Sequence, residues 1–292
     1  MPQIIQTFRT CFTFLVLALV LSPALLAAAE DDSPDYRRMN FDLFDVSMEG
    51  RVGAVKALLE QGASIKARNR FGNTALTLAA RSGKVETVKV LLEAGSNINH
   101  QNLNGSSVLF DAAKRNKEDV ALFLFEQGAD VNLVNLDQMS ALTAASYNGL
   151  TKLVGLFLEK GAAADIVDET GKSPLIYAAG NGHGEIVTLL LDAGVDPNTA
   201  HGNDLTPLMW ASSYGHEDIA SLLIERGAKV DTQDNRGRSA LMMATENSHA
   251  DMVTILVSKG ADPARADKKG VTAEKLASDS GDAATVQALK NP

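Results

Sequence analysis

Three histidines are the residues whose type and spacing come nearest to a metal site. His183, His216 and His249 lie 33 residues apart, and an imidazole nitrogen is a common zinc ligand. In a chain that repeats with this period, equivalent side chains stand about 8–10 Å apart on neighbouring helices, whereas zinc holds each ligand nitrogen at about 2 Å. The three therefore cannot share one ion. His100 and His201 have no acidic or cysteine partner at ligand spacing, so we expect no bound metal.

A phosphate-binding loop is suggested by Gly171-Lys172-Ser173, which resembles the end of that motif. The motif needs a second glycine five residues before Gly171, where this chain has Ile166. The sequence also lacks G-x-S-x-G, H-E-x-x-H and calcium-loop patterns. Its Asp and Glu residues are spread over every segment, as solvated surfaces are. We therefore expect no catalytic residue, no cofactor and no enzymatic activity.

Composition excludes several other classes of protein. The 292 residues carry a net charge of −9, which argues against nucleic acid as a partner because that affinity comes chiefly from cations that meet phosphates. A single cysteine excludes a disulfide framework and a cysteine-based structural zinc site. With 45% hydrophobic residues the chain can fold. Only 5% are aromatic, so its core must consist mostly of aliphatic side chains.

The first 29 residues have the pattern of a secretory signal peptide. Arg9 is the only charged side chain before Glu30, and an apolar run from 11 to 21 precedes the helix-breaking Pro23. Small residues two apart, Ala27 and Ala29, then provide a cleavage site. The alternative is a retained membrane anchor, since residues 11–29 are nearly long enough to span a bilayer. The proline and the alanine site favour cleavage over retention.

Cleavage after Ala29 would change the chemistry of the mature chain. It removes Arg9 and Cys11 and leaves 26 basic against 36 acidic residues, a net charge of −10 without any cysteine. An exported protein that needs no oxidising compartment fits a Gram-negative periplasm. We expect residues 30–36 to form a flexible acidic leader, the mature chain to stay out of the membrane, and its partner to be exported or membrane-associated.

Two residue series repeat with a period of 33 through the remaining chain. The first is a glycine that follows an amphipathic stretch, where a left-handed helix cap is wanted. The second is a hydroxyl residue ahead of a helical pattern, typical of an N-cap, with proline next at Pro174 and Pro207. The glycines are 62, 95, 128, 161, 194, 227 and 260, and the hydroxyl residues are 74, 107, 140, 173, 206, 239 and 272.

Each period reads as two helices joined by turns, and one such unit cannot bury its own apolar stripe. Stacked units can, which predicts an all-α solenoid of about eight 33-residue helix-turn-helix units with turn or β-hairpin tips. The end units are more polar, as caps that face water must be. The expected units are residues 37–67, 68–100, 101–133, 134–166, 167–199, 200–232, 233–265 and 266–292.

The unit resembles the ankyrin repeat over residues 37–292. Residues 171–179 (GKSPLIYAA) and 204–211 (DLTPLMWA) match the family's G-x-T-P-L-H-x-A-A stretch, and residues 227–231 (GAKVD) match its closing G-A-D-V-N. One departure is systematic, because the family's histidine after the leucine is absent. Its place is taken by Thr77, Phe110, Thr143, Ile176, Met209, Met242 and Lys275. We expect apolar packing to replace its hydrogen bond in several units.

The resemblance implies a partner-binding surface on the concave face, made of turn tips and first helices. Apolar residues at exposed tips are hard to explain as core, and interface hot spots favour aromatics and arginine. For Tyr177 and Trp210, packing between units is an equal alternative. The expected partner-binding residues are Arg70, Phe71, Arg81, Leu103, Lys114, Arg115, Leu136, Met139, Tyr147, Glu169, Leu205, Trp210, Tyr214, Arg236 and Arg238.

Charge along this face changes from basic to acidic and back to basic. The early cations are Arg68, Arg70, Arg81, Lys114 and Arg115, the middle anions Asp137, Asp168 and Glu169, and the late cations Arg236, Arg238, Lys268 and Lys269. Such a pattern can orient an acidic or mixed-charge protein, although solvation alone also places lysines on surfaces.

Two functions fit these expectations. The first is a monomeric, exported scaffold that binds a partner protein and stabilises or regulates it. The second is an immunity or inhibitor protein that neutralises a toxin or hydrolase. Tight one-to-one binding, or a toxin gene directly upstream, would favour the second.

The cleavage site provides the first test. We expect the exported protein to begin at Glu30, because the alanine site directly precedes it. Intact-mass measurement on protein from the exporting cell checks this. A mass that retains residues 1–29, with the protein in the membrane fraction, would instead identify an anchor.

Overall fold

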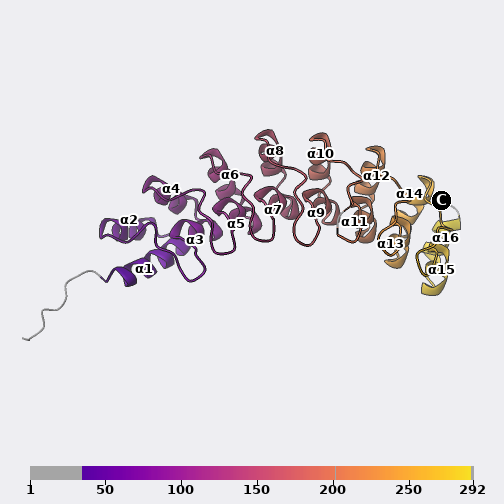
Figure 1. Ribbon diagram of the computed structural model, residues 1–292, viewed down its shortest axis with the longest axis horizontal. Helices are drawn as coiled ribbons and strands as arrows, with labels where there is room; N and C mark the ends of the chain where they lie inside the picture. The colour runs from indigo at the N-terminus through magenta and orange to yellow at the C-terminus, as the bar shows by residue number, and fades with distance from the viewer. Residues whose placement is uncertain (1–34, 201, 291–292) are drawn as a thin grey trace, which may run out of the picture.

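The computed structural model describes residues 35–200 and 202–290, and within them the chain folds into sixteen helices without a strand (Figure 1). The helices follow one another as antiparallel pairs. The first helices of the pairs are α1 (Tyr36–Glu49), α3 (Ala75–Arg81), α5 (Val108–Lys114), α7 (Ala141–Asn148), α9 (Pro174–Gly180), α11 (Pro207–Tyr214), α13 (Ala240–Glu246) and α15 (Ala273–Ser280). The second helices are α2 (Val52–Glu60), α4 (Val85–Glu93), α6 (Glu118–Glu126), α8 (Thr151–Glu159), α10 (Gly184–Asp192), α12 (Glu217–Glu225), α14 (Ala250–Ser258) and α16 (Ala283–Lys290).

Both predicted capping series occupy the positions that the sequence assigned to them. At each hydroxyl residue, from Thr74 to Thr272, the side chain accepts a hydrogen bond from the backbone N–H three residues later. This satisfies an amide that the first turn of a helix leaves free. The series glycines lie two residues beyond the second helices in the left-handed region, with φ from 82° at Gly161 to 101° at Gly62.

The core is a continuous layer shared between neighbouring helix pairs. Small side chains such as Ala112 and Ala179, both fully buried, let adjacent first helices approach closely. Large aliphatics such as Leu190 and Leu223 fill the layer between first and second helices. The expected apolar substitutes for the family's histidine are buried as well, namely Phe110, Ile176, Met209 and Met242. Each pair therefore depends on its neighbours for burial.

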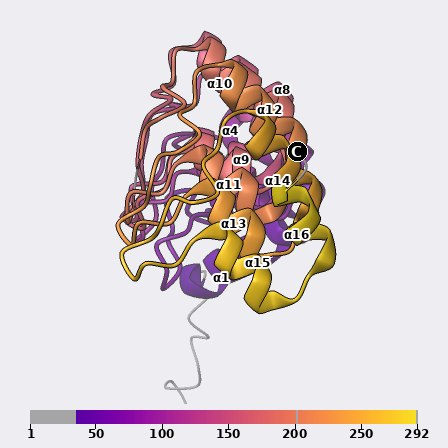
Figure 2. The ribbon, with the colours of Figure 1, turned by 90° about the vertical axis from the view of Figure 1, so that its right-hand side faces the viewer.

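The pairs stack into a curved array that has three layers. The second helices lie along the outer edge, the first helices form the middle layer, and the turns between pairs project along the inner edge (Figure 1). The end-on view shows the same turns gathered on one side of the helices (Figure 2). Tips and first helices thus share the concave side.

The tips are turns. Where β-hairpins were expected, the structure has two isolated antiparallel bridges. Gln101 pairs with Ser107 and Gln233 with Ser239, and no strand forms among the residues that the structure describes. The physical reason is that a side chain takes the amides that a longer ladder would use. In the first of these tips, Asn102 Oδ1 accepts the amides of Asn104 and Ser106.

The N-terminal predictions fall mostly outside the structure. Residues 1–34, which contain the predicted signal peptide and most of the leader, are not among the described residues. Helix α1 begins at Tyr36, with Asp35 as its N-cap, so the ordered array starts one residue before the predicted boundary. Within 35–200 and 202–290, none of the helices has the length and apolar character required to cross a bilayer.

A substitution in the shared core should act locally. Leu190→Ala removes a fully buried side chain of α10 and should lower the free energy of unfolding by about 2–5 kcal/mol. Hydrogen exchange should accelerate most in α10 and in α8, α9 and α12, which contact it. Urea unfolding checks the first expectation, with Leu136→Ala, 64% exposed, as the matched control. A uniform loss of protection along the whole array would contradict the local model.

Candidate partner-binding site

The predicted partner-binding residues all lie in the turn tips or at the first helices, and none of the fifteen is buried. Five of its large apolar members are more than half exposed, from 51% for Tyr147 to 68% for Leu103, whereas Met139, Leu205 and Trp210 are half-buried. Outside α1, the exposed large apolar side chains of the described chain are Phe71, Leu103, Leu136, Tyr147 and Tyr214. All five belong to the predicted surface. Burial of such groups by a partner is the main source of binding energy at an interface.

Backbone hydrogen bonds join successive tips into a rigid row. The Leu103 amide donates to the Phe71 carbonyl at 3.1 Å, and the Leu136 amide donates to the Asn104 carbonyl at 2.9 Å. The row continues where the Glu169 amide donates to the Asp137 carbonyl at 3.0 Å. The exposed tip side chains are therefore held at a fixed spacing, so their ordering costs little when a partner binds.

A second series in the tips was missed by the sequence analysis. Its members are Asn or Asp, and Oδ1 accepts the backbone amide four residues later and, at most tips, also the one two residues later. The residues are Asn69, Asn102, Asn135, Asp168, Asp234 and Asp267. These side chains shape the tips as Asx turns. The signal was visible in the sequence, because the series keeps the 33-residue period with His201 at the one remaining position.

Asp168 belongs to this framework, which corrects its expected role as a free negative charge on the concave face. It is only 6% exposed, and its Oδ2 accepts a hydrogen bond from the Tyr177 hydroxyl at 2.5 Å. Burial opposes ionisation of Asp168, but hydrogen bonds from the Tyr177 hydroxyl, the Lys172 amide and Thr170 hold its pKa below the ordinary value. Burial and the bond to Asp168 raise the pKa of Tyr177 to about 12.

Aromatic rings form a row across α7, α9 and α11. The rings of Tyr147 and Tyr177 meet edge to face with centroids 5.5 Å apart, and those of Trp210 and Tyr214 stack at 6.0 Å. Lys172 links the two pairs, because its Nζ lies 5.5 Å from the Tyr177 centroid and 5.1 Å from the Trp210 centroid. Tyr177 and Trp210 are half-buried, so they pack between units and still reach the surface. Lys172 was not among the predicted binding residues.

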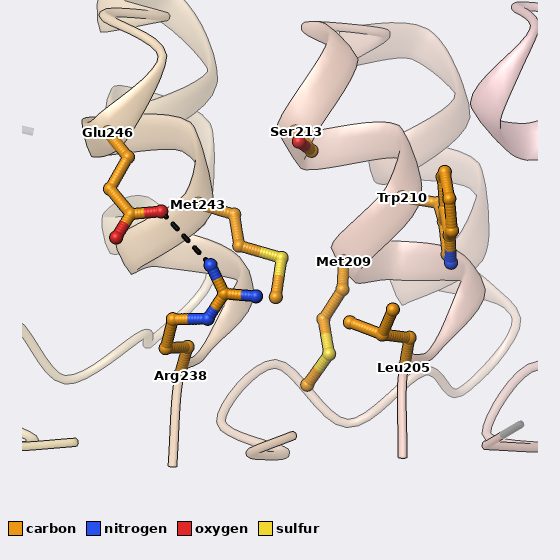
Figure 3. Close-up of a pocket in the computed structure, with 7 residues that line it drawn as sticks. All are labelled: Leu205, Met209, Trp210, Ser213, Arg238, Met243 and Glu246. Carbon is orange, nitrogen blue, oxygen red and sulfur yellow. Dashed lines mark hydrogen bonds and ion pairs between the residues drawn. The ribbon is translucent and has the colours of Figure 1, made fainter. Parts of the chain in front are cut away.

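A small hollow of about 120 Å³ lies between α11 and α13 (Figure 3). Leu205, Trp210 and Met243 line it with apolar surface. Arg238 stands at its edge, where the guanidinium contacts Glu246 at 3.3 Å and Asp234 at 3.1 Å. Arg238 was predicted as a free cation of the binding face, but these two carboxylates largely neutralise it. Arg236 lies in the turn and is exposed, as predicted.

The three histidines that suggested a metal site are structural. Each occupies the N-cap position of a second helix and places its ring against the preceding unit. The Nε2 atoms of His183, His216 and His249 lie 3.0–3.1 Å from the carbonyls of Tyr147, Gly180 and Ser213 respectively. His100 is buried and bonds the Gly72 carbonyl at 2.7 Å. Within the described ranges, no group of three or more His, Cys, Asp or Glu could hold a metal ion.

A family model described as ankyrin repeats (3 copies) matches residues 43–135, 141–234 and 208–291. The search of curated proteins gave no match.

The bond between Tyr177 and Asp168 provides a test of the framework. Tyr177→Phe should lower the free energy of unfolding by about 1–2 kcal/mol near neutral pH, because Asp168 loses a hydroxyl donor. The lowered pKa of Asp168 means that the ionised form stabilises the fold. This contribution is complete above the unfolded pKa, near ~3.9, and is lost as the pH falls through the lower folded value.

Urea unfolding of both proteins between pH 3 and pH 8 measures this effect. Tyr147→Phe is the matched control, because its hydroxyl has no hydrogen-bond partner among the described residues. A deficit in Tyr177→Phe that stays constant down to the lowest pH would show that the Asp168 carboxylate is not involved.

Proposed function

Because the chain belongs to the ankyrin repeat family, whose members generally are non-catalytic scaffolds for protein–protein interaction, we propose that it binds a partner protein on its concave face. Binding would stabilise or regulate that partner. The observation that carries this proposal is the concentration of exposed apolar side chains, Phe71, Leu103, Leu136, Tyr147 and Tyr214, on a row of tips and first helices that backbone bonds hold rigid.

Charge supports a partner that is acidic or of mixed charge. Arg81, Lys114 and Arg115 form no ion pair within 4.0 Å among the described residues, although the chain as a whole is acidic. Unpaired cations gathered on one face of an acidic protein steer anions toward that face. The middle of the face remains acidic at Asp137 and Glu169, both exposed. These charges would fix the direction in which the partner lies along the array.

The location and assembly of the protein are part of the same proposal. We place it in a Gram-negative periplasm after removal of residues 1–29, with an exported or membrane-associated partner. The apolar segment and the alanine site support export, and the absence of cysteine from the mature chain suits that compartment. We count the helix pairs as eight repeats in a monomer, since the last pair carries the polar outer surface of a cap.

A second function, an immunity or inhibitor protein, would use the same surface. The rigid row of tips favours it, because a preorganised surface loses little entropy on binding and can reach very high affinity. The two functions can be distinguished by the affinity of the complex and by the identity of the partner. Subnanomolar one-to-one binding that blocks a hydrolase or toxin would support inhibition.

The concave face can be tested by charge reversal and truncation once crosslinking in periplasmic extract has captured a partner. Arg81→Glu with Arg115→Glu should slow association by roughly tenfold at low salt and weaken its salt dependence. Tyr147→Ala or Tyr214→Ala should mainly accelerate dissociation, by roughly tenfold or more, because an apolar anchor is lost. Both effects can be measured as the association and dissociation rates of the partner on immobilised protein at several salt concentrations.

The control is a matched double reversal on the outer helices, Lys56→Glu with Lys152→Glu. Both lysines are exposed on second helices, and neither forms an ion pair among the described residues. Lys89 is less suitable, because its Nζ pairs with Glu86 at 2.7 Å. If the outer reversals disrupt the complex and the concave ones do not, the partner binds the convex side.

A further inference from the structure

One carboxylate occupies a position where the other repeats carry apolar or aromatic side chains. The fourth residue after the capping hydroxyl is Leu78, Ala144, Tyr177, Trp210 and Met243 in other units, but Asp111 in the third. Like Ala144, Tyr177, Trp210 and Met243, Asp111 lines a hollow beside a first helix. The fold needs an apolar or neutral group here, so a carboxylate demands a separate explanation.

Asp111 is buried without a partner for one of its oxygens. The residue is 6% exposed, and its Oδ2 accepts no hydrogen bond within the described chain. It also forms no ion pair within 4.0 Å among the described residues. Leaving a buried carboxylate oxygen without a hydrogen bond costs free energy, and a bound group that supplies a hydrogen bond would offset this cost.

Asp111 lines a hollow of about 330 Å³ whose other walls are cationic and polar. Arg81 comes from α3, Lys114 and Arg115 come from α5 itself, and the tip contributes side chains of asparagine and serine. The lining residues are Arg81, Asn102, Asn104, Ser106, Phe110, Asp111, Lys114 and Arg115. Helices α6 and α7, which also pack on α5, place no titratable group in this lining.

The charges around the hollow select an anion as its occupant. A basic side chain could pair with Asp111, but it would have to pass three cations. A carboxylate is attracted by Arg81, Lys114 and Arg115 and is repelled only by Asp111. Burial raises the pKa of Asp111, although the three cations act in the opposite direction. A protonated Asp111 would remove the one repulsion and supply a hydrogen-bond donor.

We propose that this hollow binds a Glu or Asp side chain of the partner protein, and that Asp111 takes up a proton and donates a hydrogen bond to the bound carboxylate. The proton comes from solvent, and no covalent bond changes. An O–H donor to a carboxylate is among the stronger hydrogen bonds in proteins. This inference rests on the proposed function, since it identifies one chemical group of the partner and one contact that recognises it.

A neighbouring pocket indicates which residue follows the acidic one in the partner. A second hollow of about 230 Å³ is lined by apolar groups of Met139, Ala144, Tyr147 and Tyr177. Lys114 lines both hollows, so they adjoin at its side chain. An acidic residue next to an aromatic or aliphatic one would fill both, with the carboxylate beside Arg81 and the apolar side chain against Tyr147.

Two short peptides can probe the site on the full mature chain. The probe is acetyl-Glu-Phe-amide, and acetyl-Gln-Phe-amide is its uncharged match. Two-dimensional NMR titration should give at least roughly tenfold tighter binding of the Glu peptide, since a charge-assisted contact is worth about that factor. Its affinity should fall as the pH rises from 5.5 to 8.0, and the carboxyl carbon of Asp111 should titrate at higher pH when the peptide is bound.

Substitutions of Asp111 separate its proposed role from mere packing. Asp111→Asn keeps a donor and removes the negative charge, so it should bind the Glu peptide at least as tightly and without the pH dependence. Asp111→Ala lacks the donor and should bind roughly tenfold more weakly than Asp111→Asn. Asp137→Asn, at an exposed tip nearby, should leave the pH dependence intact. Thermal unfolding of each variant verifies that the array is folded.

Three results would overturn the inference: equal affinity for the Glu and Gln peptides, loss of Glu-peptide binding in Asp111→Asn, or a pH dependence that survives in Asp111→Asn. The proposed function fails separately. If the peptides do not bind but capture of the partner still depends on Tyr214, which lies outside both hollows, the hollow is wrong and the concave face stands. If the peptides do not bind and capture of the partner does not depend on Tyr214 either, both proposals fail.

Discussion

A pair of short helices in this protein cannot bury its apolar stripe by itself, and the rest of the structure follows from that constraint. Each unit must cover its neighbour, so the residues that make the contact recur every 33 positions. Alanines sit where first helices approach each other, and Leu190 or its equivalents fill the layer behind them. The stack also separates the surface into an outer edge of second helices and an inner edge of tips.

Much of the polar chemistry serves this stacking. Histidines bond carbonyls of the preceding unit, and Asn or Asp side chains close the tips. Asn148 and Asn181, which occupy positions that vary between repeats, also donate to carbonyls of the preceding first helix. Charged groups that the framework does not use are therefore the candidates for the proposed binding chemistry. Arg81, Lys114, Arg115 and the Oδ2 atom of Asp111 are in this class.

Rigidity and recognition are linked on the concave side. The bonds that join one tip to the next also fix the spacing of Phe71, Leu103 and Leu136. Lys172 joins the aromatic pairs of α7–α9 and α11 through its contacts with Tyr177 and Trp210. A partner would meet a surface that is already ordered, which lowers the entropic cost of association.

The period, the helix pairs, the capping residues and the outward side of each unit could be predicted from the sequence, because these depend on local spacing that every unit repeats. It also identified the apolar tip residues, whose exposure follows from their place in the turn. Which charges are free could not be predicted in this way, because it depends on contacts between side chains that the fold brings together. Asp168 and Arg238 looked like surface charges, but Tyr177 and two carboxylates engage them. Asp111 looked like one helical residue among many, and its isolation among three cations arises from side chains of two units that only stacking brings together.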